Sequence, residues 1–277
     1  MNAQRSIIIS CTTTKNRIEL LFYMIESLKK QALMPDMVYV NISSAPSLAT
    51  EGIARLPAWL DKEFIKINRV KDMGPYTKLL PVIEMVEDND LIVTADDDIL
   101  YHPTWLQSLV ELADTHPDHI ICARARNIKK NIFGKWQGYY NWDRICRTKE
   151  GMSILPTGAG GVVYRKALLD VEFLMDLTAQ DIAPTTDDLW FRMASLRKKV
   201  PVYVCPEIDQ KSIYLKHNKG LEQINFNRKK NSYYRDNKKN NPIKKMRAWI
   251  GIKTTRNDKA WSRINRFSCS QHGSQGR

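Results

Sequence analysis

The chain has 277 residues, enough to bury a sizeable core, and its hydrophobic (43%) and charged (26%) fractions are those of a globular protein, which excludes disorder throughout. Its formal net charge of +13 would suggest a nucleic-acid-binding protein if the charge were spread evenly. It is concentrated instead between Lys211 and Arg277, where 18 Lys and Arg stand against three acids, so the body of the chain is close to neutral.

The first half of the chain alternates predicted strands and helices. Short apolar runs typical of buried strands cover residues 5–11, 37–42, 65–70 and 90–95. Helical spacing of apolar residues is found over 17–31, 76–87 and a segment that begins near Pro103. The hydroxyls of Thr12, Thr13 and Thr14 are expected to cap the first helix. The order strand, helix, strand predicts βαβ units in a parallel sheet.

The second half is less regular. Strands are predicted over residues 120–125, 162–164 and 202–205, and helices over 166–173 and 184–198. The interval 127–156 is rich in aromatic residues and glycine, and we expect it to form loops that shape a pocket.

The cysteines and the N-terminus bear on location. Five cysteines without metal-finger spacing indicate free thiols in a reducing compartment. The apolar run from Ser6 to Cys11 is too short for a signal peptide or a membrane span. We therefore expect a cytoplasmic protein whose membrane contact is peripheral, at the inner face of the cytoplasmic membrane.

Three adjacent aspartates follow a predicted buried strand. Asp96, Asp97 and Asp98 come directly after Leu-Ile-Val-Thr-Ala, and open α/β sheets bind ligands at the carboxyl ends of their strands. Alternation along an extended segment would place Asp96 and Asp98 on one side, where carboxylate oxygens suit Mg²⁺ or Mn²⁺. The alternative is a loop that solvates its acids or caps the next helix.

The order of the motifs resembles a known family. A strand followed by Thr-Thr, a Gly-Pro-Tyr-Thr-Lys segment, a strand ending in Asp-Asp-Asp, a Gly-rich turn and an Asp-Asp-Leu-Trp helix are similar to GT-A glycosyltransferases of the family 2 type. The likeness covers about residues 6–220 and is strongest to enzymes of bacterial capsule and lipopolysaccharide synthesis.

This resemblance implies an α/β fold of the GT-A kind, which is a Rossmann-like, mostly parallel central sheet flanked by helices. The GT-A domain would occupy residues 1–220, and residues 221–277 would form a basic, partly helical extension. The implied activity is inverting transfer of a sugar from a nucleotide diphosphate sugar, with a UDP-sugar as the expected donor. The acceptor would be a glycan or lipid-linked glycan, and Mn²⁺ or Mg²⁺ would assist.

The resemblance also implies the metal and donor residues. Asp98 would bind the metal ion, while Asp96 and Asp97 would contact the donor. Three consecutive aspartates leave this register open, so Asp96 is a second candidate ligand. His217, after the last predicted strand, would complete the metal site. A surface or structural histidine is the alternative.

A carboxylate at a helix start is the expected general base. Inverting transfer needs a group that takes the proton of the acceptor hydroxyl. The resemblance assigns this role to Asp188, with Asp187 as the runner-up, and plain N-capping by one of them is the alternative.

Other residues are candidates by position. Lys78 could meet a phosphate or a ribose group, and Thr13 with Arg17 could contact the nucleotide. Gly158, Gly160 and Gly161 form a Gly-rich turn that would approach the acceptor, or else they permit tight packing.

Aromatic residues of the middle interval are candidate sugar contacts. Trp136 and Tyr140 could stack on the faces of acceptor sugars, as could their neighbours Tyr139 and Trp142. Core packing is the alternative explanation.

The basic tail predicts a second kind of contact. Residues 242–253, preceded by Asn241 as cap, alternate apolar and basic residues at helical spacing, which suits an anionic membrane surface. A solvated basic tail is the alternative.

Two other functions compete. A sugar-phosphate nucleotidyltransferase would also hold Mg²⁺ with acids, but the segment after the first strand lacks the glycine-rich phosphate loop. A nucleic-acid-binding protein would use only the tail, and the neutral body argues against it, so we expect no nucleic-acid partner.

Overall fold

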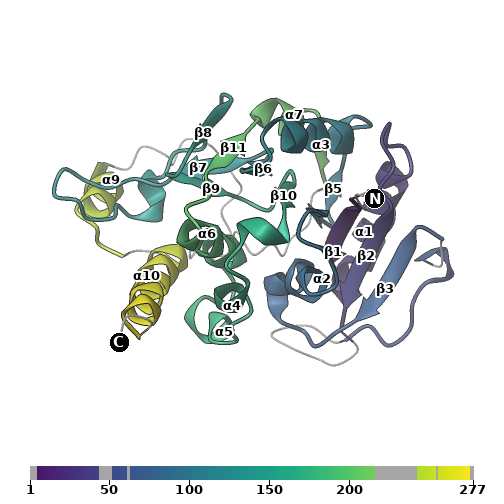
Figure 1. Cartoon of the computed structure of the whole chain (residues 1–277), viewed down its shortest axis with the longest axis horizontal. Coiled ribbons are helices and arrows are strands. Elements are labelled where there is room, and N and C mark those ends of the chain that lie inside the picture. The colour runs from purple at the N-terminus through teal and green to yellow at the C-terminus, as the bar shows by residue number, and fades with distance from the viewer. Residues whose placement is uncertain (1–4, 44–51, 61–62, 216–241, 254, 275–277) are drawn as a thin grey trace.

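The computed structural model describes residues 5–43, 52–60, 63–215, 242–253 and 255–274, and Figure 1 shows its arrangement. Its strands are β1 (Ile7–Thr12), β2 (Met37–Ile42), β3 (Ile65–Arg69), β4 (Leu91–Asp96), β5 (Ile99–Leu100), β6 (Ile120–Cys122), β7 (Ala125–Asn127), β8 (Lys149–Gly151), β9 (Ile154–Pro156), β10 (Val162–Tyr164), β11 (Val202–Val204) and β12 (Ile213–Tyr214). Its α-helices are α1 (Ile18–Leu28), α2 (Leu80–Ile83), α3 (Trp105–Thr115), α4 (Val171–Leu174), α5 (Ala179–Ile182), α6 (Asp187–Arg197), α7 (Pro206–Gln210), α9 (Pro242–Trp249) and α10 (Arg256–Ser274). Its 3₁₀ helices are η1 (Lys15–Arg17), η2 (Ala58–Leu60), η3 (Gly74–Lys78), η4 (Tyr139–Asn141) and η5 (Lys166–Leu168).

A mostly parallel sheet forms the centre of the molecule. Its strand order is β3-β2-β1-β4-β10-β6-β11-β8. The first four strands in this order run parallel to one another, as the βαβ pattern predicts. β10 is inserted antiparallel between β4 and β6. The sheet with helices on both faces confirms the predicted GT-A-like, Rossmann-like α/β fold.

The two faces of the sheet carry separate hydrophobic clusters because neighbouring residues of a strand point to opposite sides. Ile9 and Val93 pack in one cluster with residues of α1 and α3. Ile8 and Ile92 pack in the other with residues of α2, α6 and α10. The carboxyl ends of β1 and β4 are thereby held between two helical layers.

Several predicted elements are shorter than expected. The helix predicted over residues 76–87 is instead η3 followed by the four-residue α2, because Pro81 lies in the first turn and supplies no backbone N–H. The strand predicted over 120–125 divides into β6, which joins the main sheet, and β7, which pairs with β9. The helix predicted over 166–173 divides into η5 and α4, and Asp170 caps α4.

The predicted hydroxyl cap of the first helix was wrong. The chain enters α1 through η1, and neither Thr14 nor Arg17, the residues at the two helix starts, makes a side-chain capping hydrogen bond. The Thr13 hydroxyl donates instead to Asp97, 84 residues away in sequence.

The C-terminal helices pack against the rest of the molecule. Trp261 of α10 is buried in the main core, where its ring lies 5.5 Å from that of Trp142. Phe267 lies 5.8 Å from Trp190 of α6. The predicted helix near residue 242 is present as α9, whereas Asn241 lies outside the described residues. None of the helices described has the length and hydropathy needed to cross a bilayer.

Candidate active site

A buried lysine lies at the centre of the candidate site. The Nζ of Lys78 is 3.3 Å from a carboxylate oxygen of Asp96 and 3.3 Å from one of Asp187. A second acid of the same helix, Asp188, accepts a 3.0 Å hydrogen bond from the backbone N–H of Gly158. We call Lys78, Asp96, Gly158, Asp187 and Asp188 the Lys78 cluster. It joins a residue from the end of β4 with the first turn of α6.

Local structure explains the placement of Lys78. Gly74 begins η3 with φ of +62°, a conformation that side chains disfavour, and its N–H donates to Asp72. At the other end, the buried Ser10 hydroxyl of β1 donates to the Lys78 carbonyl at 2.6 Å. The backbone of Lys78 is therefore anchored to the strand that lies beside β4 in the sheet.

Burial and neighbouring charges both shift the pKa values of Lys78 and Asp188. Loss of water alone would lower the pKa of Lys78, but the carboxylates of Asp187, Asp96 and Asp188 hold it well above its usual value. Burial raises the pKa of Asp188, the negative charge of Asp187 raises it further, and Lys78 opposes the rise. The ammonium thus remains charged, and Asp188 is a stronger base than an exposed aspartate.

The other two aspartates of the triplet make different contacts. Asp97 is 4% exposed and accepts a 2.6 Å hydrogen bond from Thr13 as well as the guanidinium of Arg17. Arg17 also lies 3.0 Å from Asp98. Burial raises the pKa of Asp97 to about 7, although Arg17 and Thr13 lower it. Thr13, Arg17 and Asp97 therefore form one hydrogen-bonded network, and the Asp97 carboxyl is buried within it.

The Gly-rich turn meets the cluster through Gly158, the first glycine of the predicted turn. A Cβ on Gly158 would lie 2.7 Å from the Lys78 Nζ and 3.3 Å from an Asp188 oxygen. Gly160 and Gly161 are buried and have φ of +90° and +101°. Their hypothetical Cβ atoms would meet Asp209 and Trp105. Tight packing therefore accounts for these two glycines, and their acceptor role stays a prediction.

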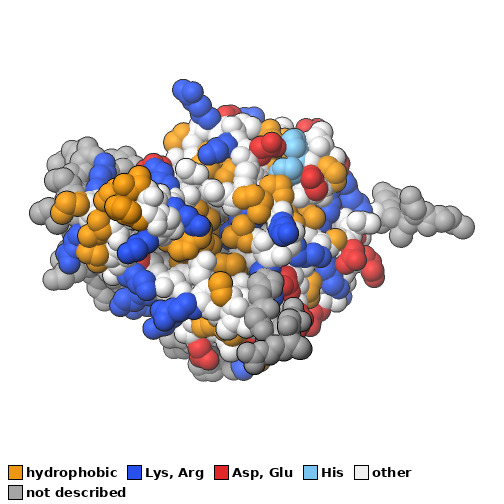
Figure 2. All heavy atoms as spheres, turned by 60° about the vertical axis from the view of Figure 1, so that its left-hand side comes forward, with side chains coloured by type: hydrophobic (Ala, Val, Ile, Leu, Met, Phe, Trp, Pro, Cys, Tyr) orange, Lys and Arg blue, Asp and Glu red, His pale blue; other side chains and the backbone are white. Residues whose placement is uncertain are grey.

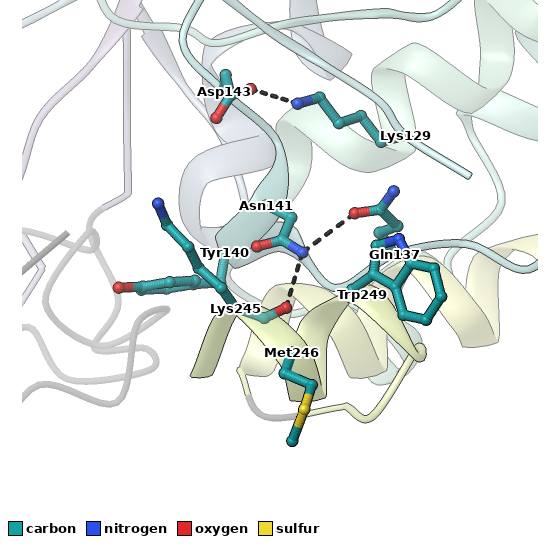
Figure 3. Close-up of a pocket in the computed structure, with 8 residues that line it drawn as sticks. All are labelled: Lys129, Gln137, Tyr140, Asn141, Asp143, Lys245, Met246 and Trp249. Carbon is teal, nitrogen blue, oxygen red and sulfur yellow. Dashed lines mark hydrogen bonds and ion pairs between the residues drawn. The ribbon is translucent and has the colours of Figure 1, made fainter. Parts of the chain in front are cut away.

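The structure does not bring the predicted aromatic contacts to the Lys78 cluster. Trp136 packs edge-on against Trp261, with ring centroids 5.6 Å apart. Tyr140 belongs to η4 and lines a hollow of about 630 Å³ beside α9. Figure 3 shows this hollow, in which the Asn141 amide bonds Gln137 and the Lys245 carbonyl. Their sugar-binding role stays a prediction for a separate part of the surface.

The candidate metal ligands supply suitable atoms but not a complete set. Asp96 and Asp98 offer carboxylate oxygens, and both side chains are partly exposed. The described residues contain no group of three His, Cys, Asp or Glu side chains able to hold a metal ion. His217 lies outside the described residues, so its predicted role is not examined by the structure.

Comparisons with known proteins bear on the family. Residues 6–178 match the family described as Glycosyl transferase family 2, a span that includes the aspartate triplet and the Gly-rich turn but ends before Asp187. No curated protein matches the chain. A similar solved structure is S. aureus TarS 1-349 in complex with UDP, at 15% identity and a TM-score of 0.44, with 73% of this chain covered. The chain spans 58% of that structure's length. Because the family match extends over more than half of its residues, the chain belongs to glycosyl transferase family 2.

Proposed function

We propose that this glycosyltransferase moves a sugar from a UDP-sugar to a hydroxyl group of a glycan or lipid-linked glycan, with inversion at the anomeric carbon. The observation that carries the proposal is the Lys78 cluster at the carboxyl end of β4, where three carboxylates surround one ammonium. Open α/β sheets bind their ligands at this edge. Family membership favours this reaction over nucleotidyl transfer and over nucleic-acid binding.

Asp188 is the proposed base. Its carboxylate accepts the proton of the acceptor hydroxyl while that oxygen bonds to the anomeric carbon. The bond between the anomeric carbon and the diphosphate breaks, and the nucleoside diphosphate leaves with the electron pair. Asp187 is the weaker candidate because it is buried and faces Lys78, whereas Asp188 is only partly buried. The N–H of Gly158 orients the Asp188 carboxylate.

The N-capping explanation for the two acids has less support. The N-cap position of α6 is occupied by Thr186, so neither acid stands at that position. The Asp188 oxygen bonds the turn at Gly158, and an Asp187 oxygen faces the ammonium of Lys78. Both acids therefore make contacts with segments other than their own helix.

The donor side of the site suits a divalent cation and a diphosphate. Asp98 with Asp96 would hold Mn²⁺ or Mg²⁺, which is commonly bound by one or two carboxylates together with substrate phosphates. Bound there, the ion would neutralise charge on the leaving diphosphate. One buried atom near these acids, the Nε of Arg17, has no hydrogen-bond partner in the described part of the chain. A buried N–H without an acceptor favours a site that an oxygen of the bound nucleotide sugar completes.

The cellular role follows the same proposal. We infer synthesis of a bacterial surface polysaccharide, such as capsule or lipopolysaccharide, at the inner face of the cytoplasmic membrane. The support is the family, together with basic and apolar side chains on α9, where a lipid-linked acceptor would be within reach.

Substitution of the proposed base tests the mechanism. The purified chain is incubated with Mn²⁺, a panel of nucleotide sugars and simple glycoside acceptors, and release of nucleoside diphosphate is measured. We expect Asp188→Asn to lower turnover by about 10²-fold or more while donor binding, measured by calorimetry, is retained. The matched control is Asp181→Asn, an exposed acid of α5. A fully active Asp188→Asn enzyme would refute the base assignment.

The metal is tested on the same assay. Chelation should abolish turnover, and Mn²⁺ should restore it in the parent chain but not in Asp98→Asn. Full turnover in the presence of a chelator would remove the metal from the proposal while leaving the base assignment intact.

A further inference from the structure

A hairpin and a helix that are far apart in sequence form one exposed apolar surface. The hairpin covers residues 128–137, and the helical segment covers 242–252. Side chains between 38% and 81% exposed gather on them. These residues, which we call the docking face, are Ile132, Phe133, Met246, Trp249, Ile250 and Ile252.

Hydrogen bonds hold the two segments of the docking face in place. The Asn131 side chain accepts from the N–H groups of Phe133 and Lys135, which closes the hairpin tip, and it donates to the carbonyl of Trp249. The N–H of Gly138 donates to the Ala248 carbonyl at 2.7 Å. Ala248 is the buried residue that seats α9 on the body. The hairpin and α9 therefore present their apolar side chains in fixed positions.

Exposure at the hairpin tip has no folding benefit. Ile132 is 81% exposed and Phe133 is 71% exposed, and each would gain from transfer out of water. Contiguous apolar surface rimmed by polar residues marks a contact with a partner or a membrane.

The charge around the face selects the partner. Residues 128–137 and 242–253 contain no Asp or Glu. The nearby Asp143 forms an ion pair with Lys129. Exposed basic side chains of the two segments are Lys130, Lys135, Lys245, Arg247 and Lys253. Figure 2 shows hydrophobic side chains gathered at the α9 end of the molecule, with lysine and arginine beside them.

We propose that the docking face inserts into the headgroup region of an anionic lipid bilayer. The apolar side chains would enter the boundary of the acyl chains while the lysines and arginines contact lipid phosphates. An anionic bilayer satisfies both properties at once, whereas an acidic protein would need apolar residues matched to the hairpin tip. The proposal does not depend on the catalytic assignment, because no member of the docking face belongs to the Lys78 cluster.

Removing the tail is not a clean test, since it would also delete α10 and its buried Trp261. The full chain is therefore used in flotation with vesicles of phosphatidylglycerol and phosphatidylethanolamine, and with vesicles of phosphatidylcholine alone. One variant is Ile132→Ser with Phe133→Ser, and a second is Arg247→Gln with Lys253→Gln. The matched control is Leu177→Ser, a residue 67% exposed outside the docking face.

We expect the parent chain and the control to float with the anionic vesicles and not with phosphatidylcholine. The partition coefficient of the hairpin variant onto anionic vesicles should be lower than that of the parent chain by about tenfold or more. The partition coefficient of the charge variant should fall by a similar factor, and about 0.5 M salt should weaken the vesicle binding of the parent chain to the same extent.

Three results would overturn the proposal. They are a parent chain that does not float, a parent that floats equally with both kinds of vesicle, and a hairpin variant that floats as well as the parent. Gel filtration with light-scattering detection measures self-association in the same samples. A dimeric parent that fails to float, with a monomeric hairpin variant, would assign the docking face to an interface between copies. Nucleotide-sugar turnover with a water-soluble acceptor should be unchanged in the hairpin variant, which separates this test from the catalytic one.

Discussion

Replacing Lys78 by methionine should destabilise the fold, because the ammonium balances buried carboxylates. Methionine keeps most of the side-chain volume but removes the charge. At the observed 3.3 Å, each pair with Asp96 and Asp187 corresponds to about 5 kcal/mol of Coulomb energy at an effective dielectric constant of about 20. The variant no longer has to remove water from a buried ammonium, and this gain offsets much of the lost Coulomb energy. We therefore expect a net loss of about 3–5 kcal/mol in the free energy of unfolding at neutral pH.

The loss should depend on pH in a defined direction. Without the ammonium, nothing offsets the repulsion between Asp187 and Asp188, and the folded-state pKa of Asp188, which burial and the charge of Asp187 already raise, rises further. A carboxyl with a raised folded-state pKa favours the folded state below its unfolded pKa, and that stability is lost as pH rises through the folded pKa. The defect of Lys78→Met should therefore be largest near pH 7.5 and smaller near pH 5.

Urea denaturation followed by circular dichroism measures this effect at both pH values. The matched control is Lys149→Met, an exposed lysine of β8. The reasoning is refuted if Lys78→Met is as stable as the control at pH 7.5, or if its defect is the same at both pH values.

Three further predictions concern other parts of the structure. Because burial raises the Asp97 pKa from 3.8 to about 7, this carboxyl should make stability fall by up to about 4 kcal/mol between pH 4 and pH 7, and Asp97→Asn should flatten that dependence in urea titrations. Gly161→Ala should cost about 2–4 kcal/mol, since φ is +101° and a Cβ would lie 2.7 Å from Trp105; an unchanged midpoint would contradict this packing. Trp261→Ala should cost about 3–5 kcal/mol by the same measurement, whereas loss of a tail that does not pack would cost nothing.

Sequence patterns predicted the strands that carry the site. The runs that became β1 and β4 are largely apolar, so their burial on both faces could be predicted directly. The aspartate triplet and the start of α6 were likewise located, because acids after a strand or before a helix are local signals. What the patterns predicted least well were segments broken by proline or by a change of partner strand.

Contacts between distant segments had no such signal. Nothing in the pattern around Lys78 indicated that its ammonium would pair with Asp187, which lies 109 residues further along the chain. The packing of Trp261 against both Trp136 and Trp142 could not be predicted either. The sequence does not distinguish an aromatic residue that lines a pocket from one that packs in a core. A glycine that faces a charged cluster also resembles one that merely packs.

The antiparallel insertion of β10 explains how these distant residues meet. In a parallel sheet only the carboxyl ends of strands reach the ligand edge, but β10 runs opposite to β4, and Val162 pairs with Thr94. The start of β10, and therefore the turn before it, lies beside the end of β4. This places Gly158 next to both Lys78 and Asp188. The reversal of one strand thus brings the proposed base to the aspartates of β4, and a shift in the β10 register would separate them without altering any residue of the Lys78 cluster.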